Sequence, residues 1–157
     1  MLGESDLKGE EVKRIRRIAI LATAALVLTF IVAAAAYAAT LVGTNGSNAL
    51  IGTRGPDTIY GLNGFDVLEG KSGADELYAG KDPDEAYGAK AADYLVGGSG
   101  RDQLYSGRGN DIIEAADGRR DDVVCGSGKA DSATVDDDDR IFGVAKSSTV
   151  SLLPSST

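Results

Sequence analysis

A repeat of nine residues is the feature of this sequence that most restricts its fold. Seven aspartates recur at this spacing without a break, and an asparagine holds the same position one step earlier: Asn48, Asp57, Asp66, Asp75, Asp84, Asp93, Asp102 and Asp111. A helix has a period of 3.6 residues and a strand a period of two, so neither alone produces this spacing. A fixed period of this kind indicates a solenoid, in which each repeat stacks on its neighbours.

Each repeat also places the same residue types at the same positions. Counted from residue 43, Gly is most frequent at the first and fourth positions, Asp fills the sixth, and an apolar residue fills the eighth. Gly at a fixed position indicates backbone with φ > 0 or a close approach of neighbouring chains that excludes a Cβ. The pattern therefore predicts a turn followed by a very short strand in every repeat.

This arrangement resembles the hemolysin-type calcium-binding repeat, G-G-x-G-x-D-x-U-x, in which U is apolar. The resemblance covers residues 43–114. It implies an all-β fold, a right-handed parallel β-roll in which two nonapeptides make one turn, so the eight repeats give about four turns. Loops 18 residues apart would then stack in two columns, Asn48, Asp66, Asp84 and Asp102 on one edge and Asp57, Asp75, Asp93 and Asp111 on the other.

The same resemblance implies that these columns bind calcium. Carboxylate and carbonyl oxygens are the ligands that Ca²⁺ prefers. Backbone carbonyls of the glycine-rich loops are expected to complete each shell, at Gly52, Gly55, Gly61, Gly64, Gly70, Gly73, Gly97, Gly100 and Gly109. One inward apolar side chain per repeat contributes ~1.5–3 kcal/mol, whereas ordering each residue costs about 1.5 kcal/mol. We therefore expect the repeats to fold on calcium.

The eighth position of each repeat is expected to face the interior, with its neighbours facing outward. The inward residues would be Leu50, Ile59, Leu68, Leu77, Ala86, Leu95, Leu104 and Ile113. Outward residues one turn apart would then lie side by side. The sequence predicts one such ladder from Tyr60 and Tyr78 and another from Tyr87 and Tyr105.

The repeat pattern weakens in the middle and is lost after residue 114. Residues 79–87 have Ala79 and Asp82 at the glycine positions, so the middle turns are expected to hold the poorest sites. We divide the chain into a calcium-binding roll at 39–114, a degenerate repeat cap at 115–146 and a flexible Ser/Thr-rich tail at 147–157. Within the cap, the Asp-x-apolar step persists at altered spacing, at Asp122-Val123-Val124, Asp131-Ser132-Ala133 and Asp139-Arg140-Ile141.

The N-terminal segment, residues 1–38, has the pattern of a targeting segment. Basic residues at positions 13–17 precede an uncharged, largely apolar stretch over residues 18–39. Ala36-Tyr37-Ala38 provides the small residues of a cleavage site, which favours a secretory signal peptide cleaved near Ala38. An uncleaved membrane anchor is the alternative, since about 20 apolar residues suffice to span a bilayer. The predicted location is extracellular, either secreted or anchored and outward-facing.

Composition restricts the function. The formal net charge is −8, which disfavours nucleic acid and anionic membranes and favours cations as partners. The chain has no His, which excludes a Ser-His-Asp relay and a His-ligated zinc. A single Cys rules out an internal disulfide, so calcium is the remaining cross-link. We expect no enzyme activity and no small-molecule substrate. We expect an extracellular structural or adhesive module that contacts a cell surface or matrix. The alternatives are a membrane-anchored surface protein and an accessory module of a secreted enzyme.

Overall fold

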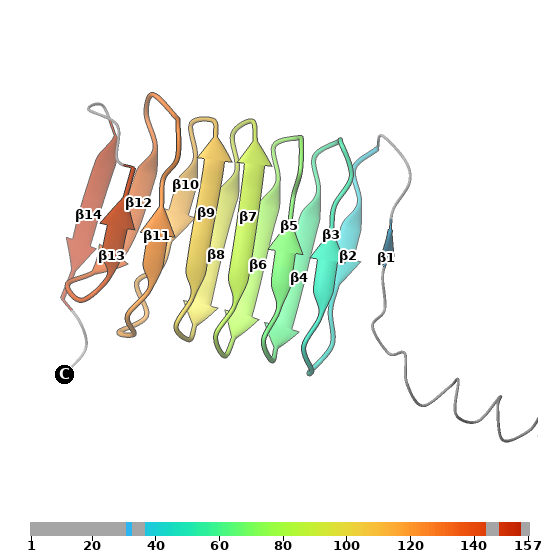
Figure 1. Ribbon diagram of the computed structural model, residues 1–157, viewed down its shortest axis with the longest axis horizontal. Coiled ribbons are helices and arrows are strands. Elements are labelled where there is room, and N and C mark those ends of the chain that lie inside the picture. The colour runs from blue at the N-terminus through green and yellow to red at the C-terminus, as the bar shows by residue number, and fades with distance from the viewer. Residues whose placement is uncertain (1–30, 33–36, 144–147, 155–157) are drawn as a thin grey trace, which may run out of the picture.

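The computed structural model describes residues 31–32, 37–143 and 148–154, and the regular structure in these residues consists only of strands. The strands form two parallel seven-stranded sheets, whose members lie side by side along the molecule (Figure 1). The odd sheet has the order β1 (Ile31–Val32), β3 (Ala49–Ile51), β5 (Val67–Glu69), β7 (Glu85–Lys90), β9 (Gln103–Arg108), β11 (Asp122–Val124) and β13 (Arg140–Phe142). The even sheet has the order β14 (Thr149–Leu153), β12 (Ser132–Asp136), β10 (Ile112–Glu114), β8 (Tyr94–Ser99), β6 (Glu76–Lys81), β4 (Thr58–Asn63) and β2 (Thr40–Val42).

The chain alternates between the two sheets, so two nonapeptides make one turn. Ile59 in β4 pairs with Leu77 in β6, which in turn pairs with Leu95 in β8, each 18 residues further along the chain. The same step relates β3 to β5, where Leu50 pairs with Leu68. This register confirms the solenoid that the nine-residue period predicts and the parallel β-roll that the resemblance implies.

The core is one cluster of inward side chains contributed by both sheets. The predicted eighth-position residues are all buried, with 0–2 % of their surface exposed: Leu50, Ile59, Leu68, Leu77, Ala86, Leu95, Leu104 and Ile113. In the three-residue strands β3, β5 and β11 the central residue is buried and its neighbours are more exposed, as the two-residue alternation of a strand requires. The predicted core is confirmed, and it continues into the C-terminal strands through Val123, Ala133 and Val135.

The expectation of about four turns was wrong, because the solenoid has about six. Residues 115–142, expected as a degenerate cap, contain β11, β12 and β13, which extend both sheets in the same parallel register. Residues 149–153, expected in a flexible tail, form β14 and pair with β12. The loops before β11 and β12 take up the extra residues, so loss of the nine-residue spacing does not interrupt the sheets.

The N-terminal targeting segment lies mostly outside the described residues. Ile31 and Val32 of this segment form β1, which pairs with Leu50 and Ile51 of β3. No helix within the described ranges is long and apolar enough to cross a membrane. The predicted signal segment therefore stays a prediction.

Candidate metal centre

The sixth-position residues lie in two columns, one at each edge where the chain enters a sheet. We call the set that precedes the odd-sheet strands the odd column: Asn48, Asp66, Asp84 and Asp102. The set that precedes the even-sheet strands is the even column: Asp57, Asp75, Asp93 and Asp111. Consecutive members are one turn apart. The predicted columns are therefore present as a spatial arrangement, and metal binding by them stays a prediction.

Each column is held by a ladder of bonds between one turn and the next. The backbone N–H of Asp66 donates to Oδ1 of Asp84 over 2.7 Å, and that of Asp84 donates to Oδ1 of Asp102 over 2.9 Å. In the even column, the N–H of Asp75 donates to Oδ1 of Asp93 over 2.9 Å. One oxygen of each carboxylate thus satisfies a buried N–H that the sheets leave free.

The second carboxylate oxygen has no such partner. In the six aspartates from Asp66 to Asp111, Oδ2 is buried and accepts no hydrogen bond: Asp66, Asp75, Asp84, Asp93, Asp102 and Asp111. A buried acceptor without a donor is costly and rare in folded proteins. An oxygen of this kind, repeated in every turn, fits a cation as its partner.

The burial of these carboxylates is reflected in their pKa values. Burial raises the pKa of Asp84, Asp93 and Asp102 to about 7 from an ordinary value of 3.8, although each carboxylate accepts a backbone N–H that lowers it. Burial likewise raises the pKa of Asp75 to about 6. No described Lys or Arg forms an ion pair with a column carboxylate in the part of the chain that the structure describes. Their charge must be neutralised by a proton or balanced by a bound cation.

The first-position glycines leave room for the carboxylates. A Cβ on Gly61 would lie 2.6 Å from Oδ2 of Asp66, and one on Gly97 would lie 2.8 Å from Oδ2 of Asp102. The same contact recurs at Gly52 and Gly70. The first position therefore requires Gly because the carboxylate of the same repeat occupies the space of a side chain.

At the fourth position, the backbone of some repeats is left-handed, which favours Gly. Gly64 and Gly73 have φ of 96° and 130°. In the irregular middle repeats, Asp82 and Ala91 adopt φ of 75° and 81° at this position, which costs about 1–2 kcal/mol for an L-residue. The middle repeats thus share the left-handed backbone of Gly64 and Gly73, and Asp84 keeps its place in the odd column.

The N-terminal members of the columns differ from the rest. Oδ1 of Asn48 accepts the N–H of Thr44 over 2.6 Å, and the carboxylate of Asp57 accepts hydrogen bonds at both oxygens, from Ala39 and Thr53. Neither has a buried oxygen without a partner. Their predicted role as ligands is therefore less well supported than that of the six aspartates that follow.

The columns continue beyond the predicted sites, at Asp121, Asp131 and Asp139. Oδ1 of Asp121 accepts the N–H of Asp102 over 2.8 Å, and Oδ1 of Asp131 accepts the N–H of Asp111 over 3.1 Å. The Asp-x-apolar step was predicted at Asp122-Val123-Val124, one residue too late. In the structure Asp121 is the column residue and Val123 the inward residue. Because Asp121 and Asp122 are adjacent, the sequence allowed either of them as the column residue. The burial of Val123 and its pairing with Leu104 select Asp121.

The carboxylates do not form a compact cluster. Among the described residues, no group of three or more His, Cys, Asp or Glu side chains is arranged to hold a metal ion. Successive column carboxylates are instead spaced by one turn, so backbone carbonyls of the loops would have to supply most of a calcium shell. Calcium accepts such carbonyl-rich, flexible sets of oxygen ligands.

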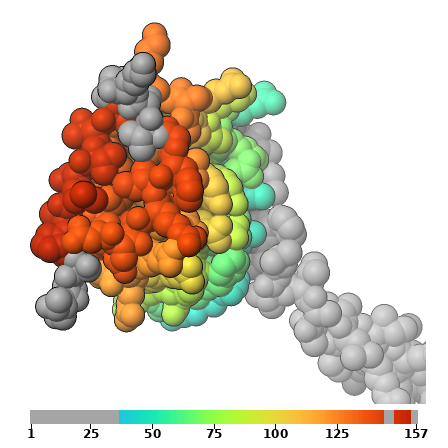
Figure 2. Space-filling model, turned by 60° about the vertical axis from the view of Figure 1, so that its left-hand side comes forward, coloured from blue at the N-terminus to red at the C-terminus, as the bar shows by residue number. Residues whose placement is uncertain are grey.

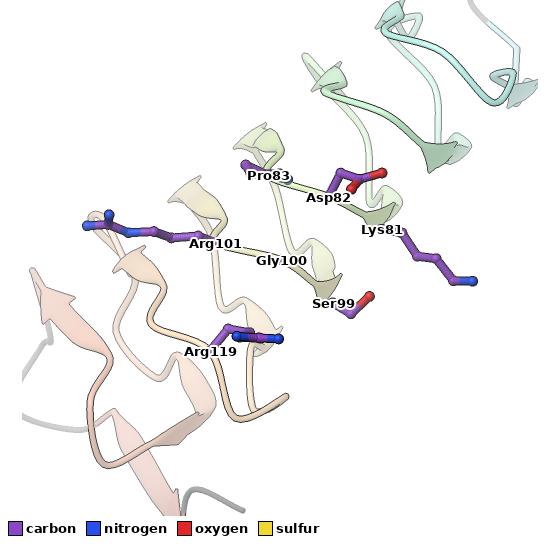
Figure 3. A pocket seen from close by; sticks show the side chains of 7 residues that line it. All are labelled: Lys81, Asp82, Pro83, Ser99, Gly100, Arg101 and Arg119. Atoms are coloured by element: carbon purple, nitrogen blue, oxygen red, sulfur yellow. The ribbon is translucent and has the colours of Figure 1, made fainter.

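A shallow depression beside the odd column carries the basic side chains Lys81, Arg101 and Arg119 (Figure 3). The side chains of Lys81 and Arg101 point in opposite directions, away from each other. Asp82 follows Lys81, and one of its carboxylate oxygens accepts the N–H of Gly64, one turn earlier, over 3.1 Å. The basic groups do not converge on one point, so this depression has no geometry for an anion.

Comparison with known proteins agrees with this geometry. A family model for the RTX calcium-binding nonapeptide repeat, in four copies, matches residues 42–77, 60–90 and 87–120. The chain belongs to this RTX repeat family. A search of curated proteins gave no match, and a search of solved structures gave none either. The RTX match includes the predicted columns from Asn48 to Asp111 and ends before Asp121.

Proposed function

We propose that the chain is a calcium-binding RTX module that folds around its metal ions. The observation that supports this most directly is the row of buried Oδ2 atoms without a donor, from Asp66 to Asp111. Carboxylates in this position repel one another and lack a basic partner among the described residues. Calcium between successive loops would supply the missing positive charge, with Oδ2 and backbone carbonyls as its ligands.

The module is proposed to act outside the cell as a structural or adhesive element, without catalytic activity. Free calcium of about 1 mM, as found outside cells, suits modules with weak sites. Residues 1–38 would direct secretion, and the mature chain would begin near Ala39, whose N–H donates to Oδ1 of Asp57 over 2.7 Å. N-terminal sequencing separates this proposal from the anchored alternative, which predicts that Met1 is retained in a membrane fraction.

Far-UV circular dichroism of the purified protein, with chelator and with calcium, tests the proposal. In chelator the column carboxylates are uncompensated at neutral pH, so we expect little β-structure. Calcium at about 1 mM should produce β-structure cooperatively, because each turn is stabilised by its neighbours. Magnesium should be a poor substitute, since it requires a smaller octahedral shell. Equal β-structure in chelator and in calcium at neutral pH would contradict calcium-driven folding.

A further inference from the structure

The C-terminal turns reproduce the column geometry in residues that the RTX match does not include. Asp121 precedes β11 and Asp131 precedes β12, and their side chains are 0 % and 1 % exposed. Both accept an N–H at Oδ1 from the preceding turn of their column, as Asp84 and Asp102 do. These turns lie next to the last strands, β13 and β14, at the C-terminal end of the stack, which faces the viewer in Figure 2.

The second oxygen distinguishes these two aspartates from the last member of the odd column. Oδ2 of Asp121 and Oδ2 of Asp131 are buried and accept no hydrogen bond. In Asp139, by contrast, Oδ1 accepts the N–H of Asp121 over 2.8 Å and Oδ2 accepts the N–H of Asp136 over 2.7 Å. Asp139 therefore terminates its column with both oxygens satisfied, while Asp121 and Asp131 each keep an oxygen free.

The loop before Asp131 also preserves the contacts of a regular repeat. A Cβ on Gly128 would collide with the carbonyl oxygen of Gly109 and with Oδ1 of Asp131. The corresponding Cβ on Gly109 would collide in the same way with the carbonyl oxygen of Ala91 and with Oδ1 of Asp111. The longer loop thus brings a glycine, a carbonyl from the turn before and a column carboxylate into the same arrangement.

We propose that calcium is also bound in the C-terminal turns, with Asp121 and Asp131 as carboxylate ligands, so that both columns extend past the nonapeptide register. The inference rests on the proposed calcium function of the repeats. It predicts that the protein binds more calcium than the sites of residues 43–114 alone can hold. The oxygen-only donor set, carboxylate and backbone carbonyl, matches the ligand class of the repeats.

The test is the number of calcium ions bound per chain, measured by equilibrium dialysis of the full-length protein. The test variant is Asp121→Asn combined with Asp131→Asn, in which the amide oxygen can still accept the N–H of the preceding turn. Asn is compatible with this position, since Asn48 occupies it in the N-terminal turn. The control combines Asp137→Asn with Asp138→Asn, which removes the same charge from two exposed residues outside the columns.

We expect the test variant to bind fewer ions than the wild type and the control to bind the same number. An unchanged number in the test variant would overturn the inference while leaving the proposed function intact. If the wild type bound no calcium, the proposed function itself would fail.

A second measurement uses the unmodified protein and does not depend on how the variant folds. Small amounts of gadolinium are added to the calcium-loaded protein, and broadening of backbone amide signals is followed by NMR. Exchange into the C-terminal sites should broaden the signals of Val123 and Ala133, next to the proposed ligands, as strongly as those in the repeats around Asp75 and Asp84. Clearly weaker broadening at Val123 and Ala133 than around Asp75 and Asp84 would overturn the inference.

Discussion

At the scale of single residues, the glycine at the first position and the aspartate at the sixth form one unit. The carboxylate folds back over its own loop, so that Oδ2 lies beside the position that a Cβ on the glycine would occupy, while Oδ1 reaches the neighbouring turn. Gly88 and Asp93 show this arrangement in the even column, although residues 88–96 depart from the repeat pattern elsewhere. The Gly and the Asp are therefore required together, because the Asp carboxylate occupies the space that a side chain at the glycine position would need.

Gly88→Ala is predicted to destabilise the calcium-bound protein. The new Cβ would lie 2.6 Å from Oδ2 of Asp93 and 2.7 Å from the carbonyl oxygen of Ser106. Overpacking of this kind typically costs about 1–3 kcal/mol, and urea unfolding in saturating calcium measures the loss. Gly46→Ala is the control, since a Cβ there has no heavy atom within 4 Å. Equal stability of the two variants would show that the first position tolerates a side chain.

At the scale of strands, outward side chains one turn apart add a second set of contacts between neighbours. The rings of Tyr60 and Tyr78 stack with centroids 4.9 Å apart, and those of Tyr87 and Tyr105 do so at the same separation. Both predicted tyrosine ladders are thus confirmed. The hydroxyl of Tyr87 also donates to Glu85 over 2.9 Å. Because the rings stack on one another, the ladders support the parallel pairing of the strands beneath them.

A double-mutant cycle measures the contribution of the stacked pair on β7 and β9. We expect Tyr87→Ala and Tyr105→Ala to be coupled by ~0.5–1.5 kcal/mol in the free energy of unfolding, as for other aromatic pairs. Tyr87→Ala with Tyr78→Ala is the control, since these rings belong to different sheets. The control pair should be additive. Additivity in the stacked pair would mean that the ladder contributes only through burial of each ring by itself.

At the scale of the whole molecule, stability depends on the sum of many contacts between adjacent turns. Each strand contacts chiefly the strands one turn away in its sheet and those beside it in the other sheet. The same stacking places the carboxylates of each column one turn apart along the solenoid. Removing their charge in any one turn therefore affects the neighbours above and below it.

Without calcium, the protein is predicted to be more stable in mild acid than at neutral pH. Burial raises the pKa of the column aspartates from 3.8 to about 6 in Asp75, about 7 in Asp84 and about 8 in Asp121. The folded state then binds more protons than the unfolded state. The stabilisation is fully present below pH 3.8, the unfolded value, and is lost as the pH rises through about 6 to 8.

Because little β-structure is expected in chelator at neutral pH, far-UV circular dichroism in chelator from mild acid to neutral pH measures the effect, and calcium provides the control. In saturating calcium the carboxylates are ionised in the folded protein, and between about pH 6 and 8 they are ionised in the unfolded chain too, so no protons are exchanged and stability should change little with pH there. A stability in chelator that rises from acid to neutral pH would contradict the buried, uncompensated state of the columns.

Much of the fold followed from the sequence alone because the repeat is regular. In a solenoid the same position meets the same environment in every turn, so the spacing indicated the repeating unit, and the resemblance to the calcium-binding repeat implied the two columns and the inward eighth residues. Leu77 and Leu95 were identified as core in this way, and both are fully buried. Tyr87 and Tyr105 were paired by the same reasoning. Their contact follows from the 18-residue step that relates β7 to β9.

The extent of the solenoid and the state of each carboxylate oxygen were decided only by the tertiary structure. Asp121 and Asp131 are 19 and 20 residues from their column neighbours, since loops absorb extra residues without moving the strands. The nine-residue spacing does not identify these two column residues, whereas their burial and the pairing of the strands that follow them do. Whether an oxygen is free, as in Asp121, or satisfied, as in Asp139, depends on N–H groups of neighbouring loops. The sequence by itself determined the repeating unit, and contacts between turns decided where that unit continues and where it ends.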